Sequence, residues 1–140
     1  ETYLHARVRE EIERAIRYPS AATLLTFCSP HTESDTVAQL GIRLTNDLRM
    51  TDQVFSLSEG GLALLLVETP EEGAQKVLHR LSSDLEQFFE SYGYSITSFP
   101  VDANLAEDFL NLALERHNKV SRQMYSGGNG GTSEAASAVH

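Results

Sequence analysis

The feature that most constrains the fold is the run Leu62-Ala63-Leu64-Leu65-Leu66-Val67, which is apolar at every position. A strand with one solvated face alternates apolar and polar residues, so a run that is apolar on both faces predicts a central strand covered on both sides. Gly60 and Gly61 precede this run, and a second strand-like segment, 53–57, lies just before them. Because paired glycines permit the positive φ of a tight turn, the two segments are predicted to form a hairpin.

Helical and strand-like patterns alternate through the rest of the chain. One helix has a well-marked start, because Thr69 is a candidate N-cap and Pro70 suits the first helical position. The order of elements is α-β-α-β-β-α-β-α, which predicts an α/β layered sandwich with an antiparallel hairpin in its sheet. Four helices are expected: one that ends near residue 18 and buries Leu4, Val8, Ile12 and Ile16, and three that cover about 37–49, 70–92 and 104–120. The expected strands are 21–28, 53–57, 62–68 and 94–99.

Composition narrows the class of protein. Of the 140 residues, 41% are apolar and 22% are charged, which is ordinary for a folded domain. No apolar run approaches the roughly eighteen residues that span a bilayer, so we expect no direct membrane insertion by this segment. The formal charge of −9 has the wrong sign for a surface that holds many nucleic-acid phosphates, so no polynucleotide partner is expected.

The residue inventory also limits the possible sites. Cys28 is the single cysteine, which excludes an internal disulfide and a cysteine-rich zinc site, and the five histidines show no pair at metal-ligand spacing. No metal or cofactor is therefore expected. We expect residues 1–125 to form one domain and residues 126–140, which are rich in glycine and serine, to be a disordered tail or linker. The chain opens on Glu1 without a signal-peptide pattern, which suggests a piece of a longer protein.

Several strings resemble the GGDEF domain family, the bacterial diguanylate cyclases and their degenerate relatives. The segment 48–69, which begins Leu-Arg-Met-Thr-Asp and continues through the predicted hairpin, aligns without gaps to the family pattern. The helix and strand at the start of the chain and the string Ser98-Phe99-Pro100-Val101-Asp102 are similar to the family as well. The resemblance implies a nucleotidyl cyclase-like fold with a central, mainly antiparallel sheet of about five strands flanked by helices.

In this alignment the signature Gly-Gly-Asp-Glu-Phe is replaced by Ser58-Glu59-Gly60-Gly61-Leu62. The family's acidic residues, which hold metal and position the triphosphate, are thus missing. Shifting the register so that Gly60-Gly61 becomes the glycine pair does not restore them, because Leu62 and Ala63 would replace the acids. The family's metal-binding Asp near the end of the first strand is also absent from Thr26-Phe27-Cys28-Ser29. Phosphoryl transfer between nucleotides depends on divalent cations with oxygen ligands, so no catalytic residue is assigned and no cyclase activity is expected.

A second family feature is retained. Arg49-Met50-Thr51-Asp52 has the Arg-x-x-Asp form of the family's inhibitory site, and five residues separate Asp52 from the signature position, as in the family. An Arg-x-x-Asp pattern alone is weak evidence, because it arises easily by chance. Its position at the family spacing is what supports a binding site. In the family this site binds the product, cyclic di-GMP, and Arg80 falls where a further arginine completes it. The chemistry fits, because an arginine fork can bind guanine O6 and N7 or a phosphate, and a carboxylate can accept from guanine N1 and N2.

The resemblance therefore implies a catalytically silent receptor for cyclic di-GMP, with Arg49, Asp52 and Arg80 as ligand-binding residues. It would be cytoplasmic, or the cytoplasmic part of a larger membrane-attached protein, and would signal to other domains of the same protein, with a homodimer as a further possible state. Two alternatives stay open. Arg49 and Asp52 could be a structural ion pair that caps the helix or the loop amides, and the domain could act through protein contacts or dimerisation without a ligand.

Overall fold

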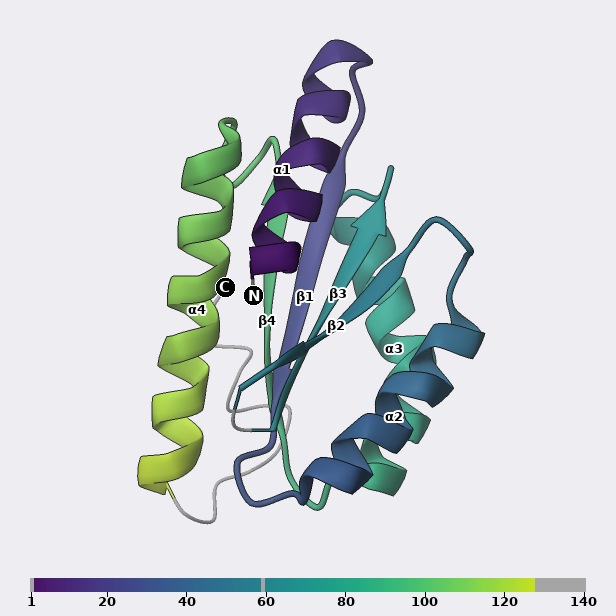
Figure 1. The fold of residues 1–140 in the computed structure, drawn as a ribbon, viewed down its shortest axis with the longest axis vertical. Helices are drawn as coiled ribbons and strands as arrows, with labels where there is room; N and C mark the ends of the chain where they lie inside the picture. The colour runs from purple at the N-terminus through teal and green to yellow at the C-terminus, as the bar shows by residue number, and fades with distance from the viewer. Residues whose placement is uncertain (1, 59, 128–140) are drawn as a thin grey trace.

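The computed structural model describes residues 2–58 and 60–127, which form three layers, helix pair, sheet and helix pair (Figure 1). Helices α1 and α4 lie on one face of the sheet, and α2 and α3 cover the other face. The elements in chain order are α1 (Thr2–Arg17), β1 (Ala22–Cys28), α2 (Ser34–Asp47), β2 (Gln53–Leu57), β3 (Gly61–Val67), α3 (Glu71–Phe88), β4 (Gly93–Phe99) and α4 (Ala106–Gly127).

The sheet has the strand order β2-β3-β1-β4, and every neighbouring pair is antiparallel. As the apolar run predicts, β3 is an interior strand, paired to β2 on one side and to β1 on the other. Alternate residues of β3 enter two separate cores: Leu64 packs toward α2 and α3, and Leu65 packs toward α1 and α4. The α/β class and the antiparallel hairpin are thus confirmed, with four strands where the resemblance implied about five. The described residues contain four strands, and the segment that follows β4 forms a turn and not a further strand.

Helix α1 packs on the sheet through Leu4, Val8, Ile12 and Ala15, all buried. The sequence predicted Ile16 in this stripe, which is wrong, because Ile16 is 52% exposed. A strict four-residue spacing turns about 40° too far at each step, since a helix advances about 100° per residue. After three such steps Ile16 has rotated off the buried face, and Ala15 takes the position against the sheet.

The β2–β3 turn depends on one glycine. Gly60 has φ +78°, and its carbonyl accepts a hydrogen bond from the Ser29 amide at 3.2 Å. A Cβ at residue 60 would lie 2.4 Å from the Ser29 carbonyl oxygen, so both the angle and the space require glycine. Gly61 has already entered β3, where it pairs with Leu57 and Cys28. The turn is thereby fixed against the end of β1.

The last helix begins and ends later than predicted. It starts at Ala106, so Leu105 lies before the helix and is 58% exposed, while Phe109 is fully buried against the sheet. It continues to Gly127, and the rest of the predicted tail, residues 128–140, lies outside the described residues. None of the helices in the described part of the chain is both long enough and apolar enough to cross a membrane.

Candidate functional site

The Arg-x-x-Asp motif forms a tight turn between α2 and β2. Helix α2 ends at Asp47, the cap residue Leu48 is extended, and the Asp52 amide donates to the Arg49 carbonyl at 3.0 Å. This closes a four-residue turn with Met50 at its tip, fully exposed. The turn brings the first and fourth side chains of the motif onto the same side.

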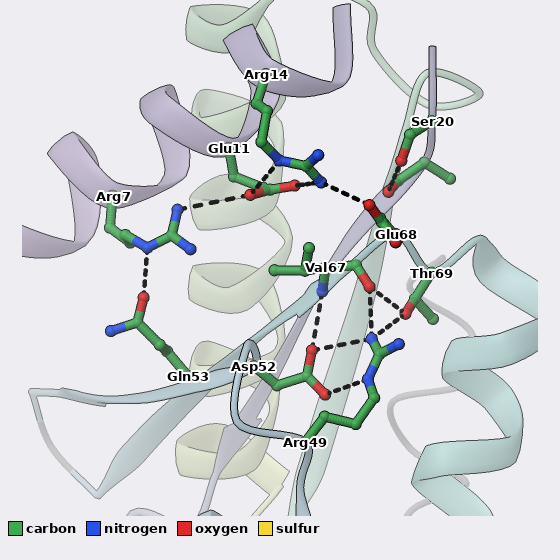
Figure 2. A network of polar contacts seen from close by, with 11 residues as sticks. Arg7, Glu11, Arg14, Ser20, Arg49, Asp52, Gln53, Val67, Glu68 and Thr69 are labelled. Atoms are coloured by element: carbon green, nitrogen blue, oxygen red, sulfur yellow. Dashed lines mark hydrogen bonds and ion pairs between the residues drawn. The ribbon is translucent and has the colours of Figure 1, made fainter. Parts of the chain in front are cut away.

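Arg49 and Asp52 form a two-pronged ion pair (Figure 2). Arg49 Nε donates to Asp52 Oδ2 and Arg49 Nη2 donates to Asp52 Oδ1, both at 3.0 Å. The two partners differ in exposure, since 55% of the Arg49 side chain is accessible and only 3% of the Asp52 side chain. The hydrogen bonds that Arg49 donates to Asp52, together with the negative charges of Asp52 and Glu68, raise the pKa of Arg49 above its usual value. Asp52 thus holds an arginine that remains largely open to solvent.

The same pair completes the hydrogen bonding of β3. The Val67 amide donates to Asp52 Oδ1 at 3.0 Å, and the Val67 carbonyl accepts from Arg49 Nη2. Val67 lies beyond Gln53↔Leu65, where the ladder between β2 and β3 ends. Val67 pairs with Ala22 of β1 on one side, and on the side where β2 has ended the two motif side chains satisfy its amide and carbonyl. This is the structural role that the sequence left open, although the groups capped belong to β3 and not to the end of α2.

Two residues beside the pair were missed as site residues. Thr69 Oγ1 donates to the Val67 carbonyl at 2.8 Å and accepts from Arg49 Nη2 at 2.9 Å. The prediction of Thr69 as the cap of α3 is wrong, because its hydroxyl is used here and the cap position is Pro70, without a side-chain cap bond. Glu68 has φ +52°, in the left-handed region that favours glycine, and its carboxylate pairs with Arg14 at 3.3 Å. No local pattern marks either role.

Arg80 lies on α3 and contacts the end of α2. Its Nη2 donates to the Asp47 carbonyl at 3.3 Å, two residues before Arg49. Arg80 thereby caps the carbonyl end of α2, and it lies on the helix layer opposite α1. The structure brings the three predicted residues to the same end of α2, with Arg49 and Asp52 in direct contact and Arg80 beside the start of their turn.

Positions 60–62, which the sequence alignment placed at the acidic part of the family signature, carry no carboxylate. Leu62 is buried against α2 and α3, and Gly60 and Gly61 bear no side chain. At the end of β1, Cys28 is buried and Ser29 donates to the Ser91 carbonyl at 2.7 Å. Within residues 2–58 and 60–127, no group of three or more histidine, cysteine, aspartate or glutamate side chains is placed to hold a metal ion. Glu59 lies outside the described residues.

A groove of about 860 Å³ runs between α1 and the Arg49 turn. The buried carboxylate of Glu11 lines the α1 side of this groove. It accepts hydrogen bonds from Arg14 at 2.8 and 3.3 Å and forms an ion pair with Arg7 at 3.7 Å. Through the Arg14 pair with Glu68 this network reaches the residues beside Arg49 (Figure 2). The i, i+4, i+7 spacing of Arg7, Glu11 and Arg14 is a visible sequence signal for such a network.

Comparison with known proteins gives a match in structure and none in sequence. No family model matches the chain, and no curated protein matches it. The GGDEF domain of YfiN (TpbB) from Pseudomonas aeruginosa matches with a TM-score of 0.73 at 17% identity, over 88% of this chain and 89% of that one. The FimX GGDEF domain from the same organism gives 0.73 at 15%, over 94% and 90%. The active GGEEF domain of a diguanylate cyclase from Vibrio cholerae gives 0.72 at 13%, over 88% and 90%. The chain therefore has the fold of GGDEF domains.

Proposed function

We propose that this domain is a receptor for cyclic di-GMP, that it binds the dinucleotide at Arg49, and that it does not synthesise it. Three observations support the proposal. The fold is that of GGDEF domains, the Arg-x-x-Asp motif stands at the spacing of their product-binding site, and Arg49 is held rigidly with a free edge. Binding of the dinucleotide at this site would be signalled to other domains of a longer bacterial signalling protein.

The free edge of Arg49 is the observation on which the proposal most depends. Nε and Nη2 are used by Asp52, Val67 and Thr69, while Nη1 makes no hydrogen bond to any described residue. A guanidinium fixed on one edge and open on the other can donate to guanine O6 and N7 or to a phosphate oxygen with little loss of side-chain entropy. In this arrangement Asp52 positions the arginine, because both of its oxygens already accept hydrogen bonds inside the protein.

Arg80 would provide a second cationic contact from α3. Its side chain is exposed, and its one described hydrogen bond, to the Asp47 carbonyl, uses Nη2 alone. An arginine at this position can stack on a purine face or bind a second phosphate. The overall charge of −9 does not oppose a small dianion, because the local field of nearby arginines decides its binding.

The absence of synthesis is part of the proposal and rests on the residues at the family's reaction centre. Positions 60–62 and 26–29 offer hydroxyl, thiol and apolar side chains and no carboxylate. Magnesium-dependent transfer between two GTP molecules needs oxygen ligands for the cation. The full chain incubated with GTP and Mg²⁺ should therefore give no dinucleotide by liquid chromatography, and accumulation of dinucleotide would contradict this part.

Calorimetric titration of the full chain with cyclic di-GMP tests the receptor role. We expect saturable binding that weakens at least tenfold in Arg49→Ala, since a charge-assisted hydrogen bond contributes about 1.5–3 kcal/mol. Arg43→Ala is a matched control, because Arg43 is also exposed and ion-paired, to Asp84 at 3.4 Å, and lies on α2 before the turn. Equal affinity in the wild type and both variants would place the ligand elsewhere.

A second candidate is an interaction or dimerisation domain without a ligand. It is favoured by one observation: Arg49 and Asp52 satisfy each other and Val67, so the motif has a structural role of its own. Met50, fully exposed at the turn tip, would then be a contact residue. This reading predicts no heat with cyclic di-GMP and a concentration-dependent increase in mass by light scattering that Met50→Asp reduces.

A further inference from the structure

The two edge strands of the sheet, β4 and β2, differ in how their outer backbone groups are used. On β4 the chain itself closes the edge. The Ser98 amide donates to Asp102 Oδ2 at 2.8 Å, and the Ser98 carbonyl accepts from the Asp102 amide at 2.9 Å. Arg116 Nη1 donates to the Ile96 carbonyl at 2.7 Å. An added strand would need these same backbone groups, so β4 is protected against pairing with another chain.

On β2 the backbone groups of Val54 and Ser56 point away from the sheet. The Val67 amide and carbonyl face the side of β2, because Asp52 and Arg49 hold them there. The backbone groups of successive residues alternate between the two sides of a strand, so residues 65, 63 and 61 of β3 face β2 and bond to residues 53, 55 and 57. Residues 54 and 56 therefore face outward, and no other residue in the described part of the chain forms a hydrogen bond with their backbone groups.

Strand β2 also lacks the features that usually protect an edge. Its sequence, Gln-Val-Phe-Ser-Leu, contains no charged residue and no proline, and its register with β3 is regular from Gln53 to Leu57. No helix is drawn across it in Figure 1. Beside it lies Tyr3 of α1, which is 64% exposed and whose ring centre is 5.7 Å from that of Phe55. An open, uncharged edge next to an exposed aromatic ring is suited to pairing with another strand.

A second copy of this chain fits the edge through a two-fold axis at Phe55. If Phe55 opposes Phe55 of the second copy in an antiparallel pair, Val54 opposes Ser56, and each such pair exchanges both of its backbone hydrogen bonds. All outward backbone groups of residues 54 and 56 are used in this register. The formal charge of −9 opposes contact between two copies over most of their surface, whereas β2 brings no charged side chain to the contact.

We propose that β2 is a dimerisation edge, at which two copies of this chain pair antiparallel and form one continuous sheet. The inference needs no ligand, so it is independent of the proposed receptor function, and it uses a different surface from the turn tip at Met50. It also brings two sites of the chain together. Because residue 52 comes opposite residue 58 of the second copy, the Arg49 turn of each copy lies beside the hairpin turn of the other.

Sedimentation equilibrium of the full chain tests the pairing. A short strand edge gives a small interface and a weak dimer, so the mass should rise from monomer toward dimer between about 10 µM and about 1 mM. Ser56→Pro, which removes one outward amide from each copy, should weaken association about tenfold or more. Ser56→Lys, which keeps the backbone and adds a charge at the edge, should weaken it as well and serves if proline disturbs the hairpin. Ser56→Ala, the matched control, should stay within about twofold of the wild type.

Amide hydrogen exchange followed by nuclear magnetic resonance locates the contact. The amides of Val54 and Ser56 should exchange more slowly at the high concentration than at the low one, while that of Phe55, which is bonded within the hairpin, should be slow at both. A chain that stays monomeric throughout would overturn the proposal. So would a dimer that leaves the Val54 and Ser56 amides unprotected, or one that Met50→Asp weakens and Ser56→Lys does not.

Discussion

Substitution of Asp52 should reveal how firmly the motif turn is held. The Asp52 carboxylate accepts three hydrogen bonds of 3.0 Å, two from Arg49 and one from the Val67 amide. In Asp52→Ala the Val67 amide loses its acceptor in a buried position, which costs about 1–3 kcal/mol. The lost ion pair adds about 0–1 kcal/mol, because 55% of the Arg49 side chain is in solvent. We therefore expect the free energy of unfolding to fall by about 1–4 kcal/mol.

Asp52→Asn is the matched variant. The amide oxygen of asparagine can still accept from the Val67 amide, so its cost should be near 1 kcal/mol. Urea unfolding followed by far-ultraviolet circular dichroism measures both variants, with an unchanged dependence on urea as the check that the denatured state is the same. A loss below about 0.5 kcal/mol in Asp52→Ala would refute the conclusion that this carboxylate caps the end of β3.

Two further predictions concern the hairpin and the contact between α2 and α3. Gly60→Ala should lower stability by about 2 kcal/mol or more, because residue 60 has φ +78° and a Cβ would meet the Ser29 carbonyl; an unchanged melting temperature would show that the turn can rearrange. The pKa of Asp47 is raised, chiefly by its hydrogen bond to Asp84 and then by desolvation, so the folded state binds the proton more tightly than the unfolded state. The stability that this proton contributes is present below the ordinary aspartate pKa and is lost as the pH rises through the raised value. Replacement of Asp47 by asparagine should therefore stabilise the chain more, or destabilise it less, at neutral pH than at pH 3. A difference in unfolding free energy between Asp47→Asn and the wild type that does not change with pH would contradict the coupling.

The layered fold was predictable because each element has its own local signal. The fully apolar run at 62–67 marks an interior strand, and the glycine before it marks the turn. The roles of single side chains that depend on tertiary contacts could not be predicted in the same way. Ile16 matches a simple repeat, yet the geometry of the helix places Ala15 against the sheet. Thr69 matches a capping pattern, yet its hydroxyl is used by Val67 and Arg49, which meet it only in the folded chain.

The site was predictable in its motif and not in its surroundings. The spacing of Arg49 and Asp52 predicts that they meet, and they do. Nothing local indicates that they cap Val67, fifteen or more residues away, or that α1 forms the opposite wall of the groove. The positive φ of Glu68, which aims its carboxylate at Arg14, is equally a product of the assembled fold.

The heat of cyclic di-GMP binding to the full chain, compared between the wild type and Arg49→Lys, tests the central claim most directly. Lysine keeps the positive charge and loses the planar fork, so reading of the ligand by a fixed guanidinium predicts saturable binding by the wild type and at least tenfold weaker binding by the lysine variant. A wild type that gives no saturable heat, or a lysine variant that binds equally well, would contradict the claim.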